Sequence, residues 1–267
     1  MSLTIVDSHC HLDRGPLNAG LDAVIARAAQ AGVKTMVTIA TRLETFPRTL
    51  AVAEAHDNIF ATVGVHPHHA EAEKEEVSAK RLLELAEHPK VIGIGEAGLD
   101  YFYDRSPRDV QMDVFRRHAA ASRESGLPLV IHTREAEDDT AQILKEETEK
   151  GAFPFVMHCF SSAPWLARLA VELGGYVSFS GILTFKKSDE VRKAASETPL
   201  ERLLVETDSP FLAPVPHRGK PCEPAYTALT LNKLAEIRGL EPQEMARRTT
   251  ENFFTLFSRA TPPREAA

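Results

Sequence analysis

The sequence is poor in cysteine, with only three among its 267 residues. Three thiols cannot all pair with one another, and Cys10, Cys159 and Cys222 form no CxxC spacing. This pattern argues against a disulfide-stapled fold and favours a reducing, cytoplasmic compartment. The N-terminus also lacks a basic segment followed by an apolar one, so we expect no cleaved signal peptide.

Long apolar runs and an excess of positive charge are missing too. No stretch approaches the roughly 18 apolar residues that a membrane-spanning helix needs, so we expect no membrane partner. The 31 lysines and arginines are outnumbered by 38 aspartates and glutamates, which gives a net charge of −7. Because proteins that coat duplex DNA are usually basic, broad nucleic-acid binding is disfavoured, while a small local phosphate site stays open. No stable protein partner is evident.

Glycine-rich nucleotide-binding motifs are absent, which removes the usual signature of an open, doubly wound sheet. The chain instead contains eight β-type runs, each followed by a helical pattern: Leu3–Asp7, Lys34–Ala40, Ile59–Val65, Val91–Gly95, Pro128–Ile131, Phe153–Met157, Gly175–Phe179 and Arg202–Val205. Apolar residues dominate these runs without clean alternation, as expected for parallel strands buried on both faces. The sequence therefore predicts an α/β fold, a (β/α)8 TIM barrel that forms one domain over residues 1–267.

Amphipathic segments lie between and after these runs. We expect helices at Leu21–Ala31, Ser78–Glu87, Val110–Ser125, Trp165–Leu173, Asp189–Ser196, Ala225–Arg238 and Gln243–Phe257. Glycine or proline follows several of them, as is typical of helix ends. The acidic tract Glu71–Glu76 is expected to be a solvated loop or helix face. Surface positions are expected for His56, His69, His88, His118 and His217.

Imidazoles stand where several of these runs stop. His9 and His11 point to the same side, because residues i and i+2 of a strand share a face. Cys10 then faces the helices, and Asp7 shares the face of the histidines one step deeper, where we expect it to orient an imidazole. In a barrel of this type, the active site lies at the C-terminal rim of the strands. These histidines are therefore expected at that rim.

Carboxylates follow two other runs. Glu96 comes between two glycines, and a buried carboxylate is costly unless it is paired or bound to a metal. Glu206 and Asp208 share one face after the eighth run, and Asp208 is nearer the rim. Glu206 is either the buried partner of a basic residue or a substrate contact. Neutral imidazoles and ionised carboxylates together suit a divalent cation, so the sequence predicts a metal-dependent hydrolase with six candidate ligands: His9, His11, Glu96, His132, His158 and Asp208.

Seven motifs, in this order, resemble those of the TatD family of metal-dependent deoxyribonucleases, which have an amidohydrolase-type barrel. They are Asp7–Leu12, Gly64–His68, Gly95–Asp100, His132–Arg134, His158–Phe160, Glu206–Pro210 and Arg218–Pro224. The resemblance implies two metal positions that share Glu96. The first would be held by His9, His11, Glu96 and Asp208, and the second by Glu96, His132 and His158.

We expect two divalent cations to activate a water molecule and to clamp the oxygens of a phosphodiester, with Glu96 and Asp208 as the catalytic carboxylates and Asp208 accepting a proton. Substrate contacts are expected from His66, Arg134, Glu206, Arg218 and Lys220. For Arg218, Lys220 and His68, a solvated loop position is equally expected. Tyr101, Phe102 and Tyr103 either stack on an exposed base or pack against the protein.

The metal is expected to be Mg²⁺, Mn²⁺ or Zn²⁺, with the highest activity in Mn²⁺ or Mg²⁺. The leading hypothesis is a 3′-to-5′ exonuclease that acts on the ends of single-stranded DNA. A second hypothesis keeps the metal site but changes the substrate to a small ester, lactone, amide or phosphotriester. A third makes the metals structural within a binding protein, and it predicts a closed coordination shell.

Overall fold

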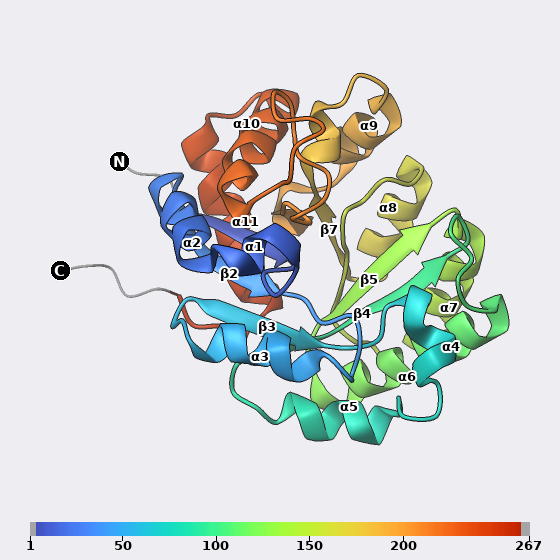
Figure 1. Ribbon diagram of the computed structural model, residues 1–267. Coiled ribbons are helices and arrows are strands. Elements are labelled where there is room, and N and C mark those ends of the chain that lie inside the picture. Colours follow the sequence, from blue (N-terminus) through green and yellow to red (C-terminus); the bar gives the residue numbers. More distant parts are fainter. Residues whose placement is uncertain (1–3, 263–267) are drawn as a thin grey trace.

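The computed structural model describes residues 4–262, and its eight parallel strands form one curved sheet (Figure 1). The strands neighbour one another in chain order: β1 (Ile5–Cys10), β2 (Val33–Thr38), β3 (Ile59–Val63), β4 (Val91–Asp100), β5 (Leu129–Arg134), β6 (Phe155–Met157), β7 (Tyr176–Phe179) and β8 (Leu203–Val205). Between β8 and β1, Ser8 Oγ donates to the carbonyl of Val205 at 3.0 Å, and Cys10 pairs with Ser209 in an isolated bridge. The sheet is therefore a nearly closed barrel, and the predicted fold class is confirmed.

Helices surround the strands (Figure 1). Within residues 4–262 they are α1 (Gly15–Ala19), α2 (Leu21–Gln30), α3 (Phe46–Glu54), α4 (Ala70–Glu73), α5 (Ala79–Ala86), α6 (Arg108–Ser125), α7 (Glu137–Glu149), α8 (Pro164–Glu172), α9 (Asp189–Glu197), α10 (Thr227–Arg238) and α11 (Pro242–Leu256). Short 3-10 helices cover Pro67–His69, Gly181–Thr184, Leu200–Arg202 and Pro224–Tyr226. Gly126 and Gly239 end α6 and α10 in the left-handed conformation, which glycine adopts without steric cost. Across the described residues, no helix combines the length and the apolar character that crossing a membrane requires.

Each predicted β-type run overlaps a strand, although Leu3 of the first lies outside the described residues. Strands β1, β4 and β5 continue beyond the predicted ends of their runs and include His9, Glu96 and His132. The expected helices correspond to α2, α5, α6, α8, α9, α10 and α11, and α3 and α7 follow the second and fifth runs, where a helical pattern was expected without stated bounds. Helix α1 was not predicted, and α4 covers the start of the acidic tract that was expected to be a loop or a helix face. The prediction of a solvated acidic tract is wrong for Glu73. Its buried carboxylate accepts hydrogen bonds from Arg42 Nε at 3.0 Å and from the backbone N–H of Leu43 at 2.7 Å. Arg42, from the loop after β2, therefore compensates the charge of a carboxylate that the local sequence predicts to be exposed.

An apolar layer fills the barrel near the N-terminal ends of the strands. Each strand contributes one side chain to it: Val6, Val37, Phe60, Ile92, Val130, Val156, Tyr176 and Leu204. Helix α11 packs against this layer with Phe253 and Leu256, and so does Phe257, which directly follows the helix. Because one residue from every strand meets in a single cluster, the cluster lies inside the barrel, and α11 closes this end. The arrangement is the layered side-chain core typical of the fold.

A second, polar layer lies two residues further along several of the same strands. Residues i and i+2 of a strand share a face, so Val130 is followed by His132, Val156 by His158 and Leu204 by Glu206. Ser8 and Ser178 follow by the same rule, and their hydroxyls are 3.1 Å apart. The interior of the barrel therefore changes from apolar to polar within two residues, toward the C-terminal rim.

Candidate metal centre

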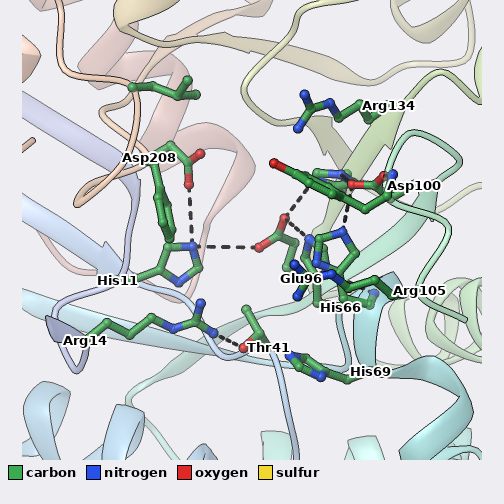
Figure 2. Close-up of a pocket in the computed structure, with 15 residues that line it drawn as sticks. His11, Arg14, Thr41, His66, His69, Glu96, Asp100, Arg105, Arg134 and Asp208 are labelled. Atoms are coloured by element: carbon green, nitrogen blue, oxygen red, sulfur yellow. Dashed lines mark hydrogen bonds and ion pairs between the residues drawn. The ribbon is translucent and has the colours of Figure 1, made fainter. Parts of the chain in front are cut away.

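The six predicted ligands lie together at the C-terminal rim, with Glu96 at their centre. Figure 2 labels His11, Glu96 and Asp208 among them. On one side, His9 Nε2 is 3.5 Å from Glu96 Oε2 and 3.5 Å from Asp208 Oδ1. His11 Nε2 is 3.4 Å from the same Asp208 oxygen and 3.4 Å from His9 Nε2. Strands β1 and β4 and the segment after β8 thus place four polar groups around one point.

The other oxygen of Glu96 faces a different set of imidazoles. Glu96 Oε1 lies 2.9 Å from His158 Nε2, 3.1 Å from His132 Nδ1 and 3.4 Å from His66 Nε2. His132 Nδ1 and His158 Nε2 are 3.4 Å apart. The two oxygens of one carboxylate therefore belong to two neighbouring clusters, an arrangement that suits a bridging carboxylate. His66, predicted to contact substrate, lies among the possible ligands.

The spacing of these atoms fits metal coordination. Ligand atoms about 2.0–2.1 Å from a tetrahedral Zn²⁺ lie roughly 3.3 Å from one another. The separations of 3.4–3.5 Å around His9, His11 and Asp208 are close to that value. The donor chemistry also fits, because imidazole nitrogens and carboxylate oxygens suit divalent transition metals. The residues present can therefore hold a cation in the first cluster.

Nearby imidazoles keep both central carboxylates ionised in spite of their burial. Burial alone would raise the pKa of the Glu96 carboxyl, but the charges of His158 and His66 and hydrogen bonds from imidazoles outweigh it and hold this pKa well below its usual range. The pKa of Asp208 is likewise lowered, because a hydrogen bond from His11 and nearby imidazole charges outweigh burial. Two ionised carboxylates in a buried site require compensating positive charge, which a metal supplies.

The imidazoles divide into two protonation classes. Burial lowers the pKa of His66 to about 3, and burial is also the largest cause that lowers the pKa of His9. The pKa values of His132 and His158 are raised, because their carboxylate partners outweigh the effect of burial. The raised pKa values favour the protonated imidazoles of His132 and His158 beside Glu96, and a cation held there would compete with those protons.

Two further carboxylates orient the imidazoles of the second cluster. Asp100 Oδ2 accepts from His132 Nε2 at 3.1 Å and from His68 Nε2 at 2.9 Å. Glu206 Oε1 accepts from His158 Nδ1 at 3.2 Å. Each bond leaves the opposite ring nitrogen of His132 or His158 facing Glu96, with its lone pair available for a metal. Such carboxylate–histidine pairs are typical of metal centres.

Of the two interpretations left open for Glu206, this geometry contradicts the substrate contact and agrees with the buried partner of a basic residue, because His158 donates to its carboxylate. The residue is fully buried beneath His158 and does not line the cavity above the cluster. The expected role of Asp7 in orienting an imidazole is also wrong. Its carboxylate accepts from the backbone N–H of Thr207 at 2.9 Å and from the Thr207 hydroxyl at 2.6 Å. A register shift between Asp7 and Cys10 breaks the simple alternation that the prediction assumed.

Glycines allow the backbone around Glu96 to approach its neighbours. A Cβ at Gly64 would overlap the backbone of Gly95, and a Cβ at Gly95 would come within 2.7 Å of the Val130 carbonyl oxygen. Gly95 also has φ +119°, which side chains rarely tolerate. These close contacts between β3, β4 and β5 place Glu96 beside His66. Gly64 and Gly95 have no side chain because the backbones approach too closely there to leave room for one.

A cavity of about 440 Å³ opens above the cluster, and Glu96 and Asp208 are both in its wall. Three arginines also line it: Arg14 after β1, Arg105 after β4 and Arg134 at the end of β5. Among the described residues, Arg105 and Arg134 form no ion pair or side-chain hydrogen bond, and Arg14 bonds only to the Thr41 hydroxyl. Figure 2 shows Arg14 and Arg134 on opposite sides of Glu96. The cavity is therefore suited to an anion.

The remaining predicted contacts lie in different places. Arg218 and Lys220 line an adjacent cavity together with Phe211, which is shared with the cavity above Glu96. The expected surface position is wrong for His118, which is fully buried because both of its nitrogens find backbone partners: Nε2 accepts from Val65 N–H and Nδ1 donates to the Val114 carbonyl. His69 is half-buried and lines the main cavity instead of the open surface.

Several cavity residues were missed by sequence reasoning. The position of Asp100 could have been predicted from the sequence, because Glu96, Gly98 and Asp100 are spaced two residues apart along one strand and so share a face. Nothing in the sequence indicated Arg14 or Arg105, because they lie in loops whose paths depend on the rest of the fold.

A parallel barrel with histidines and carboxylates clustered at its C-terminal rim belongs to the class of metal-dependent hydrolases.

Comparison with known proteins narrows this class. Residues 6–258 match the family model described as TatD related DNase. The uncharacterized metal-dependent hydrolase YabD of Bacillus subtilis (strain 168) is 40% identical over 253 residues, which cover 95% of this chain and 98% of YabD. The uncharacterized metal-dependent hydrolase YcfH of Escherichia coli (strain K12) is also 40% identical, and the match covers 95% of each chain. The crystal structure of YjjV, a TatD homologue from Escherichia coli K12, is similar with a TM-score of 0.86 and 31% identity, covering 95% of this chain and 98% of YjjV. The chain belongs to the TatD-related DNase family.

Proposed function

We propose that this protein is a two-metal phosphodiesterase that removes nucleotides from the 3′ ends of single-stranded DNA. The observation that carries the proposal is the cavity itself, in which arginines without carboxylate partners surround a cluster built for cations. The clustered charges can bind an anion locally even though the whole chain has a net charge of −7. The 3′-to-5′ direction and the choice of DNA follow from the family resemblance.

The residues divide into two ligand sets that share Glu96. His9, His11 and Asp208 complete the first set, and His132 and His158 complete the second, with His66 within reach of it. Two bound cations would lower the pKa of a water molecule toward neutrality and stabilise charge on the phosphate oxygens. Two cations are proposed because the two oxygens of Glu96 face separate clusters.

The side chains then position substrate and move a proton. Asp208 is ionised and its side chain is 15% exposed at the cavity, so it can accept the proton of the attacking water. The new bond joins the water oxygen to phosphorus, the P–O3′ bond breaks, and the proton passes to the departing 3′ oxygen. Arg14, Arg105 and Arg134, which have no carboxylate partner among the described residues, bind the phosphate oxygens. The products are a nucleoside 5′-monophosphate and a shortened strand.

A second candidate function is hydrolysis of a small ester, lactone, amide or phosphotriester. The cavity volume of about 440 Å³ favours it, because that size is typical of pockets for small ligands. The third hypothesis, structural metals in a binding protein, is disfavoured, since Glu96 and Asp208 are open to a cavity where a closed shell was expected.

The deciding experiment compares substrates on one preparation. The protein is stripped with a chelator, restored separately with Mg²⁺, Mn²⁺ or Zn²⁺, and offered end-labelled single-stranded DNA, duplex DNA, RNA and a panel of small esters. We expect metal-dependent shortening of single-stranded DNA from its 3′ end, fastest with Mn²⁺ or Mg²⁺. Hydrolysis of small esters with intact oligonucleotides would support the second function instead. Elemental analysis of the protein as purified would identify the resident metal.

A further inference from the structure

Two adjacent aromatic side chains at the mouth of the cavity have no role in the proposed chemistry. Phe102 and Tyr103 follow β4 directly, and each is 49% exposed. Large apolar side chains with that much exposure are few in the described part of the chain. Tyr103 lines the same cavity as Glu96 and Asp208. An exposed aromatic pair beside a polar cavity suggests a binding surface.

The backbone under this pair is held firmly. The Tyr103 N–H donates to Asp100 Oδ1 at 2.8 Å, and Asp100 is also bonded to His132 of the metal cluster. Tyr101 packs inward, where its hydroxyl donates to Asp139 at 2.6 Å and Arg108 covers its ring. The turn is therefore fixed on both sides of Phe102. Because this turn is held in place, the rings of Phe102 and Tyr103 are already exposed at the cavity before a ligand binds.

The rings contact an arginine that has no other partner. The Arg134 guanidinium carbon lies 3.8 Å from the centre of the Phe102 ring and 4.8 Å from that of Tyr103. Arg105 lies 5.2 Å from the centre of Tyr103, whose ring also meets His68 edge to face. Figure 2 shows Arg134 and Arg105 on the Asp100 side of Glu96, away from His11. Aromatic faces and unpaired guanidinium groups thus occur together at one edge of the cavity.

We propose that Phe102 and Tyr103 form a stacking platform for one unpaired base next to the scissile phosphate, and that Arg134 binds the phosphate of the same nucleotide. The two rings meet edge to face, with centres 4.9 Å apart and planes at 86°, so one ring stacks on the face of the base while the other packs against its edge. This inference rests on the proposed phosphodiesterase function and names the feature of the substrate that the site selects. Every base presents a π-face, so the platform selects for single strands without selecting a sequence. A base inside a duplex is already stacked and paired, and it cannot offer that face.

The test removes the base from the substrate and the rings from the protein. Wild type is compared with the double variant Phe102→Ala/Tyr103→Ala on oligothymidylates that are intact or carry an abasic residue at the terminal or the penultimate position. Phe102→Tyr and Tyr103→Phe keep an aromatic ring. Trp165→Ala removes an exposed aromatic side chain from α8 that does not line the cavity, and it serves as the matched control. Thermal unfolding confirms that each variant is folded.

We expect wild type to prefer the intact strand over one of the abasic strands by about tenfold to hundredfold in kcat/KM, mainly through KM. The double variant should lose this preference, so that its kcat/KM values on the intact and the abasic strand become equal. Phe102→Tyr, Tyr103→Phe and Trp165→Ala should keep the preference. The proposal is overturned if the double variant keeps it, or if activity falls equally on intact and abasic strands.

Binding without catalysis separates this inference from the proposed function. The affinity of each labelled strand is measured by fluorescence anisotropy in excess chelator. Base-dependent binding that the double variant loses, without hydrolysis by wild type under any metal, would reject the phosphodiesterase and retain the platform. Hydrolysis of intact and abasic strands at equal rates, with equal affinities, would reject the platform and retain the phosphodiesterase.

Discussion

The two layers inside the barrel use the same eight strands for opposite purposes. Near the N-terminal ends, predominantly apolar side chains pack together under α11. Two residues further along, His132, His158 and Glu206 occupy the corresponding face. The difference shows that the fold confines its stability to one end and its chemistry to the other, as parallel barrels generally do. Changes in the two layers should therefore affect different measurements.

Charge pairing separates the rim from the outer surface in the same way. Outside the barrel, arginines meet carboxylates, as in Arg27–Glu223 at 2.6 Å and Arg168–Glu197 at 2.7 Å. At the rim, Arg105 and Arg134 have no such partner among the described residues. Exposed ion pairs stabilise a fold little, so leaving the rim arginines unpaired costs the fold little and keeps their donors available for a ligand.

The largest effect is expected from Asp208→Asn in the polar layer. The amide cannot accept the proton of the attacking water and is a poorer metal ligand, so kcat/KM should fall by about 10²–10⁴-fold. The thermal unfolding temperature should fall slightly while the protein stays folded, because the ionised carboxylate is stabilised by the hydrogen bond from His11 and by the neighbouring imidazoles. Asp189→Asn at the start of α9 makes the same chemical change at an 89% exposed side chain and should alter neither quantity. Unchanged activity of Asp208→Asn would exclude the residue from the mechanism.

Phe253→Ala tests the apolar layer. The ring is fully buried against the strand side chains, so its loss should lower the free energy of unfolding by about 3–5 kcal/mol, measured by urea denaturation. Activity per folded molecule should be retained below the unfolding transition. Phe254→Ala, next to it on α11 and only partly buried, should cost about 1 kcal/mol. If Phe253→Ala abolished activity in folded protein, the two layers would not be independent.

Metal removal connects the polar layer to stability. Restoring Zn²⁺ to chelator-treated protein at about a hundred times its dissociation constant should raise the free energy of unfolding by about 2.7 kcal/mol. Glu96→Gln should abolish most of this increase, because both clusters lose their shared charge. Glu244→Gln on α11, where the carboxylate pairs with Arg247 at the surface, should leave it unchanged. Equal stabilisation of wild type and Glu96→Gln would place the metal elsewhere.

The sequence predicted the barrel and the ligand cluster for the same reason. Both depend on local patterns, since short apolar runs mark the strands and the polar residue at the end of each run reaches the common rim. Groups whose partners come from distant segments were predicted poorly. Glu206 meets His158, and Asp7 meets Thr207, through contacts that only the closed barrel creates. The unpaired state of Arg134 likewise depends on which carboxylates the fold leaves out of reach.

The smallest effect is expected from His118, a buried histidine outside the polar layer. Burial lowers its pKa to about 4 from an ordinary value of 6.5, so the folded protein keeps it neutral while the unfolded chain takes up a proton below pH 6.5. The free energy of unfolding should therefore fall as the pH decreases, by about 2 kcal/mol between pH 7.5 and pH 5. His118→Gln should remove this part of the pH dependence, measured by urea denaturation at both values. His56→Gln, in a half-buried turn, is the control and should keep the wild-type slope. If the slope of His118→Gln matched wild type, the pH dependence would have to come from the histidines of the metal centre, and the two kinds of buried histidine would not differ as their contacts indicate.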